Sequence, residues 1–186
     1  MKHFKLRTDL TIEVGEKILY RIEATRDIEK FGVKAGDLGG YVEKEENLSG
    51  NAWVSDLARV YGNAWVCDNA LVCDNAQVYG NARVSGDASV SGDADVSGDA
   101  LVSGNAEVCG DKIENENDLI NITSNADSYN ITITPKHIKI GCQYHSKTAW
   151  FNFTDDEIIK MDGEKAVNWW KTWKPILKSI CDGLKQ

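Results

Sequence analysis

The residues able to do chemistry in this sequence are few. Cys142 and His145, in the stretch CQYH, are a cysteine and a histidine close enough in sequence to suggest a nucleophile with its base or two metal ligands. Either role requires an orienting acid or further ligands, and no second motif supplies them. We therefore predict that both residues are structural, that the chain has neither a catalytic nor a metal-ligating site, and that it uses no cofactor.

Lysines and tryptophans near the end of the chain form a second candidate group. Lys171 and Lys174 alternate with tryptophans in NWWKTWK, and such a pattern can stack bases or hold an acidic partner. A helix whose tryptophans pack on a sheet and whose lysines face water explains the same pattern. We keep His145, Lys171 and Lys174 as candidate surface residues and favour the packed helix.

Most of the middle of the chain is a repeat. From Gly50 to Cys109 the sequence divides into ten hexads of the form Gly/Asp, Asn/Asp, Ala, x, Val, x, with valine at Val54 and at every sixth residue up to Val108. In Ala-x-Val the alanine and valine point to one side and x to the other, and the following Gly-Asn or Gly-Asp suits a sharp corner. A short arm and a corner every six residues predict a three-sided parallel β-helix with coils of eighteen residues. Leu48 and Val42 extend the valine register into an irregular opening coil.

Outward residues eighteen positions apart should lie on one face in successive coils. Aromatic residues then gather in the first coils, where they form a candidate binding patch: Trp53, Tyr61, Trp65 and Tyr79. The alternative, which we favour, is that the N-terminal segment packs over them. The cysteines of the repeat have no disulfide or metal spacing and are expected to be small outward or corner residues.

The charge of the chain is concentrated in the repeat. Between Gly50 and Asp111 there are nine acids and two arginines, a net charge of −7 out of −8 for the whole chain. Carboxylates at regular heights on a rod can mimic a nucleic-acid backbone, or they can simply keep a β-solenoid in solution. The acidic candidates for a binding surface are Asp87, Asp93, Asp95, Asp99 and Glu107.

The two ends differ from the repeat. Residues 17–28 (KILYRIEATRDI) are expected to form a strand, and alternating runs at 119–123, 129–135, 137–141 and 148–153 predict short antiparallel strands. Thr154-Asp-Asp-Glu157 is a capping box that starts a short helix ending near Gly163, and an amphipathic helix follows from about Glu164, with Pro175 expected to kink it. The predicted divisions are an N-terminal β cap (1–38), the β-helix (39–111), a linker with a first strand (112–128) and a small α+β domain (129–186).

The repeat resembles the hexapeptide-repeat superfamily of left-handed parallel β-helices, which implies the left hand. It departs from many acyltransferases of that superfamily, because glycine comes one residue later after the large aliphatic residue, as in Val84-Ser85-Gly86. The opening YRIEATRDIEKFGVKAGDLGGYVEKEENLSGNAWV is similar to an uncharacterised bacterial and phage group labelled polymer-forming or putative transferase. The block HIKIGCQYHSKTAWFNFTDDEIIKMDGEKAVNWW resembles a C-terminal module of phage- and prophage-encoded proteins. These resemblances imply a phage or prophage origin and action inside the host cell.

The superfamily resemblance first implies acyl transfer from acyl-CoA, which generally relies on a histidine near the active cleft. The histidines here are His3, His137 and His145, all outside the repeat, and no loop interrupts the hexads. End-to-end polymerisation is disfavoured because non-repeat segments follow both ends of the repeat. We therefore predict a non-enzymatic module that binds a host protein and inhibits a defence or nucleic-acid enzyme through its acidic surface. The alternatives are an acyltransferase and an oligomer, dimer or trimer, that captures a nucleotide.

Composition indicates which partners are disfavoured and in which compartment the protein is expected. A net charge of −8 disfavours direct binding to nucleic acid or to an anionic membrane. No stretch is apolar enough to span a bilayer, and the first residues have no signal-peptide core. Five cysteines without paired spacing fit free thiols in a reducing cytoplasm, so we expect a cytoplasmic protein.

Overall fold

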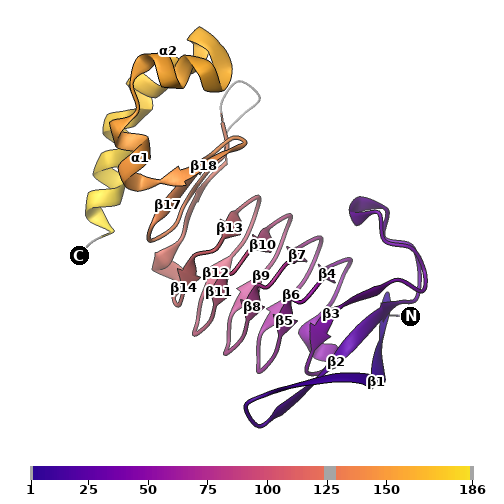
Figure 1. Ribbon diagram of the computed structural model, residues 1–186. Coiled ribbons are helices and arrows are strands. Elements are labelled where there is room, and N and C mark those ends of the chain that lie inside the picture. The colour runs from indigo at the N-terminus through magenta and orange to yellow at the C-terminus, as the bar shows by residue number, and fades with distance from the viewer. Residues whose placement is uncertain (1, 124–128, 185–186) are drawn as a thin grey trace.

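The computed structural model describes residues 2–123 and 129–184. Three parts follow one another along the chain: an N-terminal hairpin and loop, a β-solenoid, and a C-terminal sheet covered by helices (Figure 1). No helix in these ranges is long and apolar enough to cross a membrane.

Each hexad of the repeat forms one very short strand. The strands are β4 (Trp53–Val54), β5 (Arg59–Val60), β6 (Trp65–Val66), β7 (Leu71–Val72), β8 (Gln77–Val78), β9 (Arg83–Val84), β10 (Ser89–Ser91), β11 (Asp95–Val96), β12 (Leu101–Val102) and β13 (Glu107–Cys109). Each of β4 to β11 pairs in parallel with the strand one coil further on, so Trp53 lies opposite Leu71 and Trp65 opposite Arg83. The strands thus build three faces, β4-β7-β10-β13, β5-β8-β11 and β6-β9-β12. The predicted three-sided parallel β-helix is confirmed.

The interior of the solenoid is made of the alanines and valines of the hexads. All of them are at most 1 % exposed, and main-chain bonds such as Trp53 N–H to the Ala70 carbonyl join successive coils. Burying a valine side chain contributes roughly 1.5 kcal/mol or more, repeated here in every arm. The register also extends upstream as predicted, because Val42 pairs with Val60 and Leu48 bridges to Val66.

The geometry of the corners explains why the first position of each hexad is either glycine or aspartate. The residue there has a positive φ, which glycine adopts without a side-chain clash. Where aspartate replaces glycine, the positive φ is strained, and the aspartate carboxylate offsets this strain by accepting a hydrogen bond from a main-chain N–H of the next coil. Asp68 Oδ2 accepts from the Gly86 N–H at 3.1 Å, and Asp74 Oδ2 from the Gly92 N–H at 2.8 Å.

The N-terminal part caps the first coil. Strands β1 (Phe4–Val14) and β2 (Lys17–Ala24) form an antiparallel hairpin, and β3 (Leu38–Val42) joins β2 to the solenoid strand β5. Two 3₁₀ turns, η1 (Glu29–Phe31) and η2 (Glu45–Asn47), lie in the connecting loops. A strand within residues 17–28 was expected, and β2 confirms it.

The C-terminal part begins on the last coil. Strand β14 (Lys112–Ile113) pairs with β11, and η3 (Glu116–Asp118) leads into a four-stranded antiparallel sheet in chain order. Its strands are β15 (Ile120–Ile122), β16 (Ile131–Ile133), β17 (His137–Ile140) and β18 (Gln143–Ser146). Helices α1 (Lys147–Asn152) and α2 (Asp155–Gly183) pack on it. The predicted domain boundaries stay predictions.

One predicted strand is wrong. Residues 148–153 mainly form helix α1, because the Ser146 hydroxyl caps the helix by accepting from the Ala149 N–H and the Trp150 indole donates to the Ile138 carbonyl at 2.7 Å. The capping box at Thr154 and the break near Gly163 are confirmed, since the backbone of α2 is non-helical at Asp162 and Gly163. Pro175, which was expected to kink or restart the second helix, lies inside the second segment of α2, and the backbone there keeps helical φ and ψ values.

Candidate protein-binding face of the solenoid

The β6-β9-β12 face of the solenoid presents three large outward side chains in one file. We call Trp65, Arg83 and Leu101 the Trp–Arg–Leu file. Because each precedes an inward valine and they are spaced by one coil, they lie one above another. Trp65 and Leu101 are 40 % and 41 % exposed, although side chains of this size are usually covered.

Contacts within the face hold the file in place. The Arg83 guanidinium lies 5.6 Å from the centre of the Trp65 ring, a cation–π distance. The Trp65 indole N–H donates to the Ser49 hydroxyl at 2.9 Å. The Trp65 ring and its indole N–H are thus both held by contacts within the solenoid.

A ladder of amides runs beside the file at the neighbouring corner. Asn63 donates to the Asn81 side chain at 3.2 Å, and Asn81 donates to Asp99 Oδ1 at 3.0 Å. File and ladder, with Ala100 and Glu116, enclose a groove of about 550 Å³. The groove is thus apolar and cationic along one wall and polar along the other, with two carboxylates at its far end.

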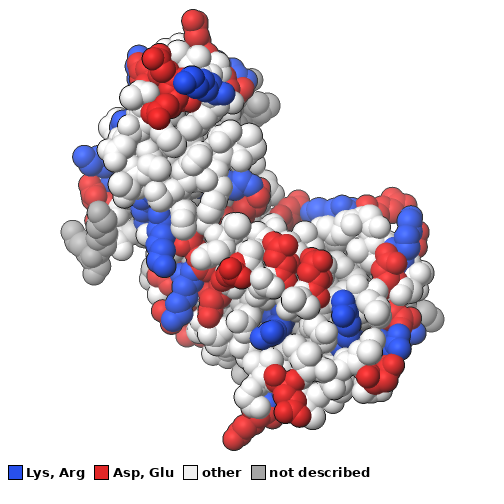
Figure 2. Space-filling view, viewed as in Figure 1, with Lys and Arg blue, Asp and Glu red and all other residues white. Residues whose placement is uncertain are grey.

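The predicted acidic surface is only partly available. Asp87, Asp93 and Asp99 each end an amide ladder, because the preceding coils carry asparagine at the same position, so the carboxylates do not repeat at every height. Asp87 also pairs with Lys30, and this ion pair lowers the pKa of its carboxyl group. In Figure 2 the acidic side chains form separate clusters among uncharged areas of the solenoid.

The other two acidic candidates also make contacts within the molecule. Asp95 accepts from the Tyr79 hydroxyl at 3.2 Å, and Glu107 pairs with Lys139 of the C-terminal sheet. Of the five acidic candidates, Asp99 is the one that lines the groove beside the Trp–Arg–Leu file. The groove is therefore a better candidate for a binding surface than a ladder of carboxylates.

The four aromatic candidates do not form one patch. Trp53 is 2 % exposed and belongs to the core together with residues of the N-terminal part such as Phe4 and Ile22, the packing that we favoured. Tyr61 and Tyr79 stack at 5.0 Å with parallel rings at a corner on the β5–β8 side. Trp65 alone of the four contributes to the groove.

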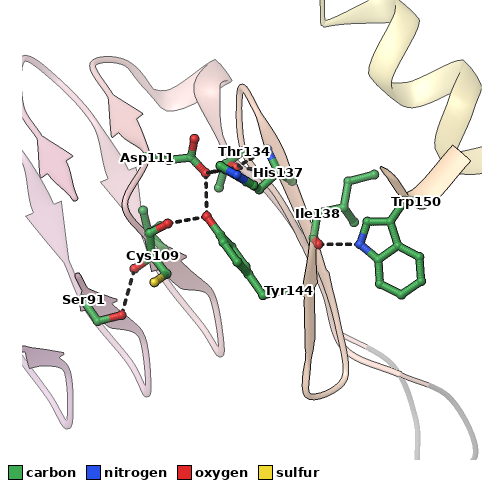
Figure 3. A network of polar contacts seen from close by, with 9 residues as sticks. Ser91, Cys109, Asp111, Thr134, His137, Ile138, Tyr144 and Trp150 are labelled. Carbon is green, nitrogen blue, oxygen red and sulfur yellow. Dashed lines mark hydrogen bonds and ion pairs between the residues drawn. The ribbon is translucent and has the colours of Figure 1, made fainter. Parts of the chain in front are cut away.

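A polar network joins the last coil to the C-terminal sheet (Figure 3). Asp111 is 1 % exposed, and its Oδ2 accepts from the Thr134 hydroxyl at 2.5 Å and lies 2.8 Å from His137 Nδ1 and 2.9 Å from the Tyr144 hydroxyl. The Tyr144 hydroxyl also contacts the Cys109 carbonyl. Burial and the neighbouring Asp111 carboxylate raise the pKa of Tyr144. The network fixes the C-terminal module relative to the groove.

Sequence reasoning missed this network because its members are distant along the chain. One signal was present: Asp111 occupies the ladder position of a hexad, eighteen residues after Asp93, where the repeat ends. The last ladder residue has no following coil to bond with, so another part of the chain must satisfy it. His137 and Tyr144 lie on the paired strands β17 and β18, and their rings stack at 4.8 Å.

The three C-terminal candidates, His145, Lys171 and Lys174, make different contacts. The His145 ring packs edge-on against Trp150 and Phe153, and its Nε2 lies 3.3 Å from Gln143. Lys171 pairs with Asp155 at 2.8 Å, whereas Lys174 lies over the Trp170 ring. Each residue thus has a packing or pairing role within the module.

The cysteines have varied surroundings. Cys67 and Cys181 are buried, Cys73 is half-buried, and Cys109 and Cys142 are exposed. Cys67 directly follows Val66 of β6, at a corner, which is one of the two placements expected, and it is buried there. Burial and a neighbouring aspartate raise the pKa values of Cys67 and Cys73 to about 11. Across residues 2–123 and 129–184, no three histidine, cysteine or acidic side chains are grouped as metal ligands.

A family model of known proteins matches part of the repeat. The family model described as YdcK beta solenoid repeat matches residues 76–92, which span β8, β9 and β10. The match supports the β-solenoid. No curated protein matches the chain.

Proposed function

We propose that the chain is a non-enzymatic protein-binding module whose contact surface is the β6-β9-β12 face. The observation that carries the proposal is the exposed Trp–Arg–Leu file beside a groove on a rigid sheet. Tryptophan and arginine are the residues that most often dominate binding energy at protein interfaces. Here both are fixed by contacts within the solenoid and remain open to a partner.

The charges beside the file indicate the kind of partner. Asp99 and Glu116 line the groove, and the chain as a whole carries a net charge of −8. A partner with an apolar side chain for Trp65 and lysine or arginine for these carboxylates fits both halves of the groove. Basic surfaces of this kind are typical of proteins that handle nucleic acids.

The resemblance to phage-encoded proteins supports a more specific form of the proposal. In this form the partner is a host defence or nucleic-acid enzyme, and the module inhibits it by occupying its basic surface. The positions of the histidines favour binding over acyl transfer. His3 is buried under the first coil, His137 bonds with Asp111, and His145 packs among aromatic rings, so none faces the groove.

Site-specific photocrosslinking tests the proposal. A photoreactive phenylalanine derivative replaces Leu101 on the proposed face, and the same residue replaces Ser89, the outward residue of β10, as a matched control. Each variant is expressed in a bacterial host and irradiated, and the products are identified by mass spectrometry. We expect one basic protein crosslinked from position 101 and not from position 89.

The competing outcomes are distinct. Crosslinks from both positions at equal yield would show that the face has no special role. A crosslink to a second copy of this chain would assign the face to homo-oligomer formation. A nucleotide retained by the purified protein would favour ligand capture over protein binding.

A further inference from the structure

A second groove lies on the C-terminal module, away from the solenoid face. The residues just before β17, helix α1 and the last turns of α2, which are yellow in Figure 1, enclose about 470 Å³. This volume is within the range of about 300–1,000 Å³ that is typical of sites for small molecules. The groove is therefore large enough to hold a ligand of its own.

Three lysines from different elements line this groove. Lys136 precedes β17, Lys147 begins α1 and Lys178 lies near the end of α2. The Lys147 N–H donates to the Lys136 carbonyl at 3.0 Å, so these two residues are neighbours. Leu177 and Cys181, both buried in the core of the module, hold the part of α2 that carries Lys178. Lys136 and Lys178 are exposed and Lys147 is half-buried, so a ligand in solution can reach all three side chains.

The charge of these lysines is not balanced within the molecule. In the part of the chain that the structure describes, nine lysines form ion pairs with carboxylates, and the three lysines of the groove are not among them. Asp182 also lines the groove, but within residues 129–184 no ion pair joins it to any of the three. Three positive charges and one negative charge give the lining a net charge of +2, in a chain of net charge −8. A bound anion would relieve the repulsion between the lysines.

An aromatic ring also lines the groove. Phe151 of α1 is half-buried, and its ring lies against the Trp170 ring, with centres 6.3 Å apart and an angle of 26° between the planes. The core of the module thus holds the phenyl ring, while its accessible part gives the groove an apolar surface. A ligand with a ring of its own can contact this surface while its charge meets the lysines.

We propose that this groove binds a small aromatic compound that carries a phosphate group. A phosphate monoester has a charge of about −1.5 to −2 at neutral pH, which matches the net charge of +2 of the lining residues. Lysine suits phosphate because its ammonium group is a point charge with several hydrogen-bond donors. A carboxylate would bring a single negative charge. The site is independent of the protein-binding face, because the two grooves share no residue.

Three small probes test the charge and the ring separately. Phenyl phosphate has both features, inorganic phosphate lacks the ring, and benzoate has the ring but a single negative charge. Affinities are measured on the full chain by isothermal titration calorimetry at low salt, and the NMR signal of the Thr148 amide, in the lining of the groove, reports where each probe binds. Phenyl phosphate should bind about threefold or more tightly than either of the other probes, because each of them lacks one of the two interactions.

Variants separate this site from the general charge of the surface. Lys136→Gln, Lys147→Gln and Lys178→Gln each remove one positive charge from the groove and should each weaken phenyl phosphate binding about threefold. Lys160→Gln is the matched control and should leave the affinity unchanged, because Lys160 is exposed on α2 and lies outside the groove. Phe151→Leu should weaken the binding of phenyl phosphate but not that of inorganic phosphate. Thermal unfolding confirms that each variant is folded.

The proposal is overturned if phenyl phosphate at millimolar concentration neither produces heat of binding nor shifts the Thr148 amide signal. An equal loss of affinity in Lys160→Gln would also overturn it, because a general charge effect would then explain the binding. Benzoate that binds as tightly as phenyl phosphate would disprove the assignment to phosphate. Inorganic phosphate that binds as tightly would disprove the role of the ring.

Discussion

His137 Nδ1 lies 2.8 Å from the Oδ2 of Asp111, and this contact joins the last coil of the solenoid to the C-terminal sheet. The two residues are 26 positions apart, on parts of the chain with unrelated sequence patterns. Thr134 and Tyr144 reach the same oxygen. Polar contacts therefore link the end of the repeat, where β12 and β13 have no further strand to pair with, to the C-terminal sheet.

Loss of this joint should loosen the C-terminal module. Asp111→Asn keeps the shape but cannot accept all three donors, so the free energy of unfolding should fall by roughly 1–3 kcal/mol. Hydrogen exchange should accelerate at the Glu107 amide, which donates to the Thr132 hydroxyl across the junction, and not in β7. Glu114→Gln, at an exposed pair with Lys112, is the control and should have no effect. Uniform acceleration across the solenoid would contradict a local role.

The corner glycines should differ in their tolerance of a side chain. Gly86 and Gly110 both have a φ of 71°, so alanine is equally strained at either position. A Cβ at Gly86 would lie 3.0 Å from the main-chain nitrogen and oxygen of Gly104, whereas at Gly110 nothing lies within 4 Å. Gly86→Ala should therefore be less stable than Gly110→Ala by about 1 kcal/mol or more in chemical denaturation. Equal losses of stability in the two variants would mean that contact with the next coil does not determine which residues a corner tolerates.

The sequence predicts the solenoid well because every coil faces the same constraint. Alanine and valine must point inward in every coil, so they recur every six residues and the period is visible in the sequence. Val42 and Leu48 extend this register correctly. Residues 148–153 show the limit of this reasoning. Their alternation of apolar residues suits a strand. The Ser146 cap, a local signal, and the packing of Trp150, a tertiary effect, favour a helix instead.

The candidate site was predicted less completely. Trp65 was named from its position, but Arg83 and Leu101 were not among the candidate residues, and the groove depends on side-chain conformations that a sequence does not specify. Trp53 has the same hexad position as Trp65 but is covered by the N-terminal part, which no period in the sequence shows. Equal positions in a repeat therefore do not imply equal exposure.

Acid should destabilise the N-terminal cap through His3. This ring is buried and donates from Nε2 to the Ala52 carbonyl at 2.7 Å, and burial lowers its pKa below the usual 6.5. The unfolded chain then binds a proton that the folded chain does not, so stability is complete above about pH 6.5 and falls as the pH decreases toward the folded pKa. His3→Gln should reduce this pH dependence in thermal unfolding between pH 7.5 and pH 5, and an unchanged slope would exclude His3 as its cause.

The thiols should react in two classes. Burial raises the pKa values of Cys67 and Cys73 to about 11 from 9.0, which lowers their thiolate fractions at neutral pH by roughly a hundredfold. Cys109 and Cys142 are exposed. Iodoacetamide with mass-spectrometric mapping should therefore label Cys109 and Cys142 first, and early labelling of Cys67 would show that the solenoid opens readily.

The affinity of the crosslinked partner for purified variants tests the protein-binding face most directly. Trp65→Ala and Arg83→Ala should each weaken binding by about tenfold or more, because anchor residues of this kind contribute at least 1–2 kcal/mol. Ser89→Ala, on another face, should leave the affinity unchanged. Added salt should weaken the wild-type complex, because we propose that basic groups of the partner face Asp99 and Glu116, which line the groove. If Trp65→Ala and Arg83→Ala bind as tightly as the wild type, the β6-β9-β12 face is not the binding surface.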